Sequence, residues 1–248
     1  MPDSRIGWIT PDWPAPVSVR AGTTTRRGGV STASYNDFNL GAHVGDDPNA
    51  VAENRRRLRE QCTLPAEPVW LRQVHGVMVV DAAQVLAAPE ADAAFTRQPG
   101  VVCAVMTADC LPVLLCDQDG TVVAAAHAGW RGLAEGVIEA AVTGMGVSAG
   151  KIMAWLGPAI GPAAFEVGEE VRARFLAHDP GAGDAFSPSQ GGRWLADIYQ
   201  LARRRLASLG IEQVYGGQWC TFSDREQFYS YRRDGVTGRM ASLVWLQP

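Results

Sequence analysis

The sequence contains few histidines and no long apolar run. Its 248 residues include only four histidines, namely His43, His75, His127 and His178. No uninterrupted stretch of about 18 apolar residues occurs, so no membrane-spanning helix is expected. The first residues lack the basic start and the apolar stretch of a secretory signal peptide. These absences predict a protein that stays in the cytoplasm.

The sequence also lacks a disulfide framework and an excess of basic residues. Its five cysteines are odd in number and show no framework spacing, which favours reduced thiols. The formal net charge is −4, which gives no electrostatic footprint for nucleic acid. Hydrophobic residues at 47% and charged residues at 19% are typical of a globular protein. We therefore expect neither nucleic acid nor membrane as a partner.

A predicted β-hairpin carries a cysteine and a histidine. Two apolar runs, Leu111–Cys116 and Thr121–Ala126, flank the turn-forming residues Asp117–Gly120. If all four of these residues form the turn, Cys110 pairs directly with His127, with Cβ atoms roughly 5 Å apart. A two-residue turn at the last two of them would shift the register and make the pair diagonal neighbours. In either register the thiol and the imidazole lie within reach of one another.

The neighbouring segments predict how other candidate residues are placed. Residues 100–107 form a continuous apolar run, hence a buried strand that delivers Asp109 and Cys110 at its end. The run Val69–Val80 suggests two strands meeting at His75 and the glycine after it. The spacing of apolar residues after Gly129 predicts one amphipathic helix that begins near His127.

Strands and helices are mixed along the chain without strict alternation, which predicts an α+β fold with mixed sheets. We find no internal repeat, no low-complexity tract and no convincing linker. The sequence therefore predicts a single domain over residues 1–248.

The residue types at these positions allow three kinds of chemistry. Two imidazoles, from His75 and His127, and the Cys110 thiolate suit Zn²⁺ with a fourth position open for water. The same three ligands with a weak axial methionine suit a copper site. Without a metal, Cys110 could act as a nucleophile with either histidine as its base.

Several motifs together closely resemble the bacterial YfiH family over roughly residues 19–246. This family is also called multicopper polyphenol oxidoreductase (laccase-like), purine nucleoside phosphorylase or peptidoglycan editing factor. The motifs are Thr23–Ser31, Asn39-Leu-Gly-Ala-His-Val-Gly-Asp-Asp-Pro, Gln73-Val-His-Gly, Thr107-Ala-Asp-Cys-Leu-Pro, His127-Ala-Gly-Trp-Arg-Gly, Gly157-Pro-Ala-Ile and Phe228-Tyr-Ser-Tyr-Arg-Arg-Asp.

The resemblance implies a single domain of layered α/β/β/α type, similar to the catalytic domain of cytotoxic necrotising factor, a cysteine-dependent deamidase. It implies zinc held by His75, Cys110 and His127, with copper as an alternative occupant. The implied activities are phosphorolysis of purine nucleosides and methylthioadenosine, and deamination of adenosine. Polyphenol oxidation, an older claim for the family, requires a copper–thiolate site and a separate three-copper cluster. Histidine is the usual ligand of both, and four histidines are too few.

Further residues are candidates for roles in these reactions. A zinc ion that lowers the pKa of its water to about 7 suits attack on C6 of adenine, with Asp109 or Glu166 as proton shuttle. Phosphorolysis needs a phosphate held against the ribose. The candidate substrate-binding residues are Arg26 or its neighbour Arg27 on a glycine-rich loop, Arg131 beside His127, His43 as proton donor to the purine, and Asn39.

Other functions remain open from the residues. They are a hydrolase that edits a peptidoglycan precursor, a metal-free cysteine amidase or deamidase, and a metal-binding regulatory protein without turnover.

Overall fold

A computed structural model describes residues 5–85 and 87–248. Its strands are β1 (Trp8–Ile9), β2 (Val19–Thr24), β3 (Val79–Asp81), β4 (Ala93–Thr96), β5 (Val102–Thr107), β6 (Leu111–Asp117), β7 (Val123–Ala128), β8 (Ile152–Leu156), β9 (Glu166–Val167), β10 (Phe186–Pro188), β11 (Trp194–Ala196), β12 (Gln213–Gly216) and β13 (Met240–Leu246). Its α-helices are α1 (Pro48–Gln61), α2 (Trp130–Glu135), α3 (Val137–Met145), α4 (Glu169–His178), α5 (Ile198–Ser208) and α6 (Tyr231–Asp234).

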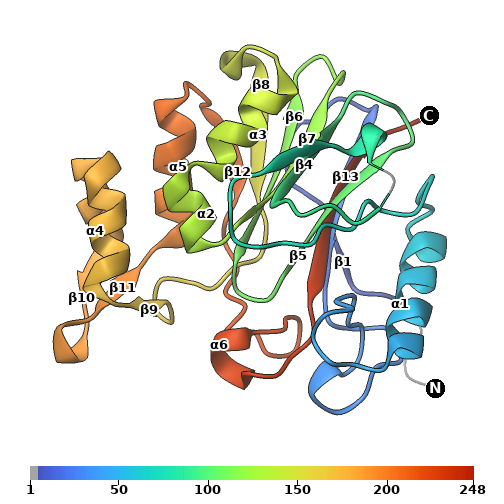
Figure 1. Ribbon diagram of the computed structural model, residues 1–248, viewed down its shortest axis with the longest axis horizontal. Helices are drawn as coiled ribbons and strands as arrows, with labels where there is room; N and C mark the ends of the chain where they lie inside the picture. Colours follow the sequence, from blue (N-terminus) through green and yellow to red (C-terminus); the bar gives the residue numbers. More distant parts are fainter. Residues whose placement is uncertain (1–4, 86) are drawn as a thin grey trace.

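Two large sheets form the centre of the molecule. One sheet has the order β1-β2-β13-β5 and is antiparallel throughout. The other has the order β12-β8-β6-β7-β4-β3, with parallel pairs at both edges and antiparallel pairs between them. A small sheet of order β10-β11-β9 lies beside α4 (Figure 1). The predicted α+β fold with mixed sheets is therefore confirmed.

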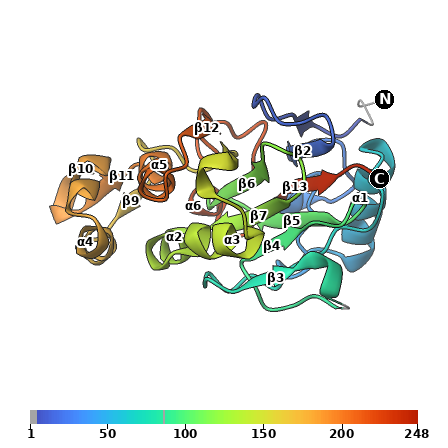
Figure 2. The same ribbon diagram turned by 90° about the horizontal axis from the view of Figure 1, so that it is seen from above.

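The chain forms four layers, as Figures 1 and 2 show from two directions. Alternate residues of β6 explain this order, because successive side chains of a strand point to opposite faces. Leu111, Val113 and Leu115 pack on one face, against the helices α3 and α5. Leu114 and Cys116 pack instead against the second sheet. The far face of that sheet packs against α1, so the order is helix, sheet, sheet, helix.

The register of the central hairpin differs from the direct pairing that a four-residue turn would give. Pro112, rather than Cys110, pairs with His127, and Leu111 pairs with Ala128. The observed register is the one that a two-residue turn would give. Cys110 and His127 are thus diagonal rather than direct neighbours.

Two predictions about local structure are wrong. The segment before β3 is a loop that makes single bridges at Val69 and Arg72, not two strands meeting at His75. The helix predicted after Gly129 is divided into α2 and α3 at Gly136, which has a φ of 100°. A left-handed residue ends one helix and starts the next in a new direction.

Helix α1 begins as its sequence predicts. Asp47 accepts a hydrogen bond from the Asn49 amide, and Pro48 occupies the first helical position. No helix in the described part of the chain is long and apolar enough to cross a membrane. The prediction of a single domain over residues 1–248 stays a prediction.

Candidate metal and substrate site

Three side chains that are far apart in the sequence meet beside the central hairpin. His127 is the second-last residue of β7, and Cys110 directly precedes β6. The Cys110 Sγ lies 3.9 Å from Nε2 of His75. The rings of His75 and His127 meet edge to face, with centroids 4.8 Å apart. The three potential ligand atoms all lie within 4.8 Å of one another, so the structure brings the three predicted residues together.

Gln73 fixes the loop that carries His75. Its side-chain amide donates to the Met106 carbonyl and its oxygen accepts from the Met106 amide, both at 2.8 Å. The loop is thereby fastened to the end of β5, three residues before Asp109. His75 and Asp109 have φ angles of 62° and 93°, which non-glycine residues rarely adopt. Both strained residues border the cluster, as is common at functional sites.

Asp92 connects the two histidines and was not predicted from the sequence. It lies just before β4 and is fully buried. Its carboxylate accepts a 2.8 Å hydrogen bond from Nδ1 of His127. It also accepts from three consecutive backbone amides of the other loop, those of Val74, His75 and Gly76. Because Asp92 holds Nδ1 of His127, the Nε2 lone pair is left free for a metal.

The electrostatics of the metal-free cluster favour a thiolate. Burial alone raises the pKa of the Cys110 thiol, but the His127 and His75 imidazoles outweigh burial and lower it from 9.0 to about 6. Burial lowers the pKa of His127, but the Cys110 thiolate and the Asp92 carboxylate outweigh burial and raise it to about 9. Thiolate is the form of cysteine that binds metals and attacks carbon.

Two glycines of the His127-Ala-Gly-Trp-Arg-Gly motif allow the close approach of these groups. A Cβ atom on Gly129 would lie 3.0 Å from the His75 ring and 3.1 Å from the Cys110 sulfur. A Cβ on Gly132 would lie 2.7 Å from the Gly76 carbonyl oxygen. A small open space in contact with all three potential ligands therefore exists only because residue 129 has no side chain.

The cluster opens into a cavity of about 240 Å³ with a largely apolar wall. Trp130 is half-buried, Tyr231 is exposed and Phe165 is buried. The lining residues are His75, Ala108, Asp109, Cys110, Trp130, Arg131, Ile160, Phe165, Ile198, Tyr231 and Arg232. Flat aromatic walls with a few polar groups are typical of small-molecule sites.

Neither of the predicted proton shuttles has a free carboxylate. Asp109 lines the cavity, but its oxygens accept from the Thr221 hydroxyl at 2.6 Å and from the Arg232 amide at 2.7 Å. Glu166 is not among the lining residues, and it pairs with Arg193 at 2.9 Å. These contacts give Asp109 a role in holding the loop, and they hold Glu166 in an ion pair at the surface.

The predicted substrate-binding residues do not all reach the cavity. Arg131 lines the cavity, and its guanidinium lies 4.7 Å from the centre of the Trp130 ring. The guanidinium has no hydrogen bond to a described residue. Arg26 instead donates to the carbonyls of Asn36 and Arg225.

Asn39 and His43 are also outside the lining. Asn39 is fully buried, and its amide is bonded to Gly41, Asp46 and the Arg239 backbone. His43 is exposed at the surface, and burial of part of its ring, then Arg239 and Arg55, lower its pKa. Of the four residues, the structure thus brings only Arg131 to the cluster.

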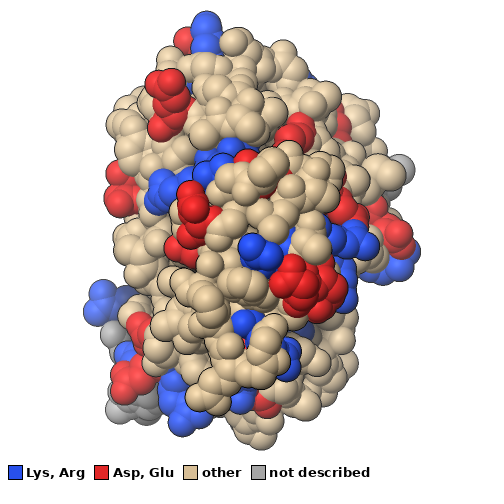
Figure 3. Space-filling model, turned by 90° about the vertical axis from the view of Figure 1, so that its left-hand side faces the viewer, with Lys and Arg blue, Asp and Glu red and all other residues tan. Residues whose placement is uncertain are grey.

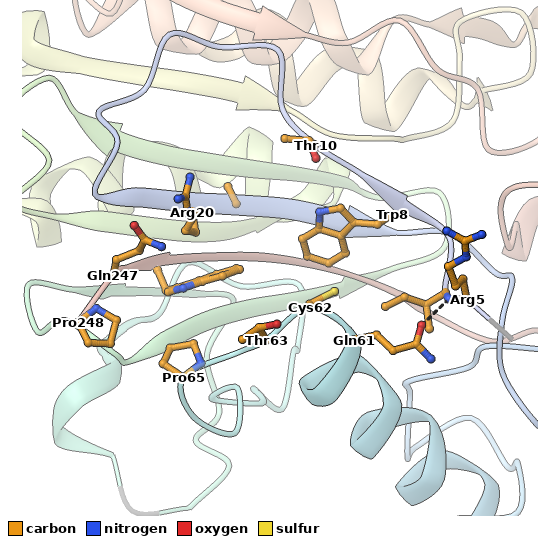
Figure 4. A pocket seen from close by; sticks show the side chains of 13 residues that line it. Arg5, Trp8, Thr10, Arg20, Gln61, Cys62, Thr63, Pro65, Gln247 and Pro248 are labelled. Atoms are coloured by element: carbon orange, nitrogen blue, oxygen red, sulfur yellow. Dashed lines mark hydrogen bonds between the residues drawn. The ribbon is translucent and has the colours of Figure 1, made fainter.

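A larger cavity of about 700 Å³ lies elsewhere, between β1, β2 and the end of α1 (Figure 4). Trp8, Arg20 and Cys62 are among the side chains that line it. Burial raises the pKa of the Cys62 thiol to about 12, so this cysteine is protonated and unreactive near neutral pH. The thiolate of Cys110 therefore makes the smaller cavity the better candidate for an active site than the larger one.

Charge is not concentrated on the face shown in Figure 3, where small groups of basic and acidic side chains alternate. Three exposed apolar side chains lie beside the cluster of His75, Cys110 and His127. Val74, Val77 and Met78 are 44%, 38% and 61% exposed, on the loop that carries His75.

Known proteins resemble this chain along its whole length. Residues 20–247 match the sequence profile of a family described as multi-copper polyphenol oxidoreductase laccase. A Pseudomonas aeruginosa protein named as a purine nucleoside phosphorylase is 61% identical over 97% of this chain and 98% of its own length. The Escherichia coli purine nucleoside phosphorylase YfiH is 56% identical over 96% of this chain and 98% of its own length.

Solved structures show the same fold. A crystal structure of a Neisseria meningitidis protein superimposes with a TM-score of 0.95 at 52% identity, covering 98% of this chain and 100% of that one. The crystal structure of YlmD from Geobacillus stearothermophilus gives a TM-score of 0.91 at 31% identity, covering 100% of this chain and 98% of that one. The match over nearly every residue and the shared fold have one consequence: the chain belongs to the YfiH family, whose profile carries the laccase description.

Proposed function

We propose that this protein is a zinc-dependent enzyme that cleaves purine nucleosides with phosphate. Adenosine, inosine and methylthioadenosine are the proposed nucleosides, and deamination of adenosine is a proposed second activity of the same site. The observation that carries the proposal is the cluster of His75, Cys110 and His127, of which His75 and Cys110 line a cavity together with aromatic side chains. Relatives at 61% and 56% identity are named as purine nucleoside phosphorylases, which supports an enzyme with a small-molecule substrate.

The three side chains fit a zinc ion. Ligand atoms on tetrahedral zinc lie about 3.5 Å apart, given bond lengths of about 2.0–2.3 Å. The potential ligand atoms lie within 4.8 Å of one another, and the Cys110 sulfur is 3.9 Å from Nε2 of His75. Gly129 leaves the space open, and Asp92 fixes the ring of His127 as carboxylates do behind metal-bound histidines. Bound zinc supplies Lewis acidity and can activate water near pH 7.

The protein's own side chains supply binding and orientation. The indole of Trp130 and the phenol ring of Tyr231 offer faces on which a purine can stack. Arg131 offers guanidinium donors that no described residue occupies. Water is kept from the apolar side of the cavity by buried Ile160, Phe165 and Ile198.

Both proposed reactions balance without an added oxidant or reductant. In phosphorolysis an oxygen of hydrogen phosphate bonds to C1′ of the ribose while the bond from C1′ to the purine nitrogen breaks. The electron pair of that bond goes to the purine, which receives the proton of hydrogen phosphate. In deamination water adds to C6 of adenine, and the amino group leaves as ammonia after taking up a proton.

A laccase function has no support in the ligands. All four histidines lie in the described part of the chain, and only His75 and His127 belong to a cluster of potential ligands there. A three-copper cluster together with a copper–thiolate site needs many more imidazoles than this. A single copper in place of zinc is compatible with the same three ligands.

The test combines metal analysis with product analysis. The protein is purified without chelator, its metals are quantified, and it is incubated with adenosine or inosine, with and without phosphate. We expect about one zinc per chain, and ribose 1-phosphate and free base only when phosphate is present. If neither nucleoside changes at any phosphate concentration, the purine function is wrong, and a peptidoglycan-editing hydrolase becomes the better hypothesis.

A metal-free cysteine amidase is the second candidate. The observation in its favour is the arrangement of Cys110, His127 and Asp92, in which the thiol has a pKa of about 6 and the imidazole is oriented by a carboxylate. Metal analysis separates the two candidates, because full activity in thoroughly metal-depleted protein favours the amidase. Residence in the cytoplasm and the absence of a nucleic-acid partner stay predictions.

A further inference from the structure

Arg239 lies at the edge of the metal cluster, although its position in the sequence did not suggest this. It directly precedes β13, whose first residue, Met240, pairs with Thr107 at the end of β5. Continuing this antiparallel register places Arg239 beside Ala108, two residues before Cys110. Its guanidinium carbon is 6.0 Å from the ring centre of Tyr231, which lines the cavity. Figure 1 shows α6 and the start of β13 together at the lower end of the sheets.

The guanidinium of Arg239 forms no ion pair with a described carboxylate. Its Nη1 donates to the backbone carbonyls of Thr237 and Gly238, both at 3.0 Å. Among described residues, no carboxylate lies within 4.0 Å of it, and its Nε and Nη2 have no hydrogen-bond partner. The Cys110 thiolate and then the Asp109 carboxylate act on it from farther away, and Thr221 and Arg232 occupy both oxygens of Asp109. The Nε and Nη2 atoms of Arg239 do not belong to the buried side-chain atoms that lack a hydrogen-bond partner, so they are accessible from outside.

A second arginine, Arg55, lies near Arg239. Arg55 donates to the Leu40 carbonyl, and the Leu40 amide donates to the Arg239 carbonyl, so the two arginines converge on one residue. Arg55 is held on the Trp70 ring at 4.0 Å. Both arginines act on exposed His43 and lower its pKa. A half-buried guanidinium whose donors lack hydrogen-bond partners can bind an anion.

We propose that Arg239 is the main contact of an oxyanion subsite beside Cys110 that holds the phosphate of phosphorolysis. This inference rests on the proposed function and adds the place where the second substrate binds. The planar guanidinium can donate to two phosphate oxygens with its Nε and Nη2, while Nη1 stays on the backbone. The sequence predicted Arg26 or Arg27, and Arg131, as phosphate contacts. The donors of Arg26 are committed to carbonyls of Asn36 and Arg225 and those of Arg27 to Glu226, whereas Arg131 lines the cavity and can be a second contact.

The subsite explains how a phosphate can be held beside the nucleoside. Tyr231 lines the cavity and Arg239 lies next to its ring, whereas Trp130 and Arg131 line the cavity from the segment after β7. A phosphate on Arg239 can direct an oxygen toward the ribose of a nucleoside stacked in the cavity. The oxygen forms the bond to C1′ as the purine leaves with the electron pair and the phosphate proton.

The test compares Arg239→Gln with Arg203→Gln in zinc-loaded protein. Arg203 is a matched control because it is also half-buried and donates only to backbone carbonyls, those of Val214 and Gly216. We expect Arg239→Gln to raise KM for phosphate about 10- to 100-fold, the usual effect of losing charge-assisted hydrogen bonds. KM for inosine should change less than about twofold, and Arg203→Gln should leave both constants unchanged. An unchanged phosphate KM in folded, zinc-loaded Arg239→Gln overturns the proposal.

Binding of inorganic phosphate without turnover separates this inference from the proposed function. Phosphate should raise the melting temperature of the wild type and of Arg203→Gln, but not that of Arg239→Gln. If phosphate does so while no nucleoside is cleaved, the subsite stands and the purine function fails. If phosphate stabilises all three proteins equally, or none of them, the subsite is wrong. Should Arg239→Gln not fold, Arg239→Lys decides, with a phosphate KM raised about 3- to 10-fold expected because a lysine cannot donate from two nitrogens.

Discussion

Replacing Asp92 by asparagine should lower both the stability of the fold and the zinc affinity of the proposed metal site. The carboxylate accepts four hydrogen bonds, of 2.8 Å from His127 Nδ1 and of 2.9, 2.7 and 3.2 Å from the amides of His75, Gly76 and Val74. An asparagine amide has one oxygen, so two of these donors lose their acceptor. At about 1.5–3 kcal/mol for each bond to a charged group, the loss of stability is about 3–6 kcal/mol.

The effect on the metal has a separate cause. The new NH₂ group can pair with His127 only if Nδ1 becomes the acceptor, which moves the ring proton to Nε2. A protonated Nε2 has no lone pair for a metal, so zinc affinity should fall about 10- to 100-fold, or about 1.4–2.7 kcal/mol. Urea unfolding of the metal-free protein measures the first effect, and zinc titration against a competing chelator at low temperature measures the second.

Asp117→Asn is the matched control for this substitution. Asp117 is as buried as Asp92. It lies at the turn end of the β6–β7 hairpin, away from His127, and its carboxylate accepts hydrogen bonds from Thr121 and Val122. It should lose stability without losing zinc affinity. The proposed role of Asp92 is refuted if Asp92→Asn binds zinc within about twofold of the wild type, or if the control loses affinity to the same extent.

Two further predictions concern the space and the charge at the cluster. Gly129→Ala should weaken zinc binding about tenfold or more with little loss of stability, because its Cβ would lie 3.0–3.1 Å from His75 and Cys110. Gly150→Ala is the control and should change neither zinc binding nor stability, because no atom lies within 4 Å of its new Cβ. Equal zinc affinity of the two variants would contradict this prediction. In metal-free protein carrying Cys220→Ser, alkylation of Cys110 by iodoacetamide should rise with pH and reach half its maximum near pH 6, since the pKa is lowered to about 6. His127→Ala should move that midpoint to a higher pH, and bound zinc should suppress the alkylation. A midpoint near pH 9 in protein that keeps His75 and His127 would show that the imidazoles do not stabilise the thiolate.

The local pattern of residues was enough to predict that His75, Cys110 and His127 lie together. Apolar runs predicted the strands on either side of Cys110 and His127, and with only four histidines in the chain there were few choices for a third ligand. Both registers that the sequence left open bring the two residues within reach, so the prediction did not depend on which of them the hairpin adopts. The capping residues of α1 were equally local and equally predictable.

Contacts between distant segments decided the rest. Asp92 meets His127 across 35 residues, and the Arg239 amide meets the Asn39 side chain across 200. A lone aspartate before a short strand or an arginine before the last strand carries no periodic signal, so neither position stands out. Conversely, Arg26 and Asn39 are of the right residue type for binding phosphate or ribose, but the folded chain commits their donors to its own backbone and side chains. The sequence by itself determined which three side chains could hold a metal, because those residue types are rare and their strands are locally encoded. Only the tertiary structure decided which carboxylate orients them and which arginine has donors left for a substrate, because a hydrogen bond between remote segments exists only after the sheets have packed.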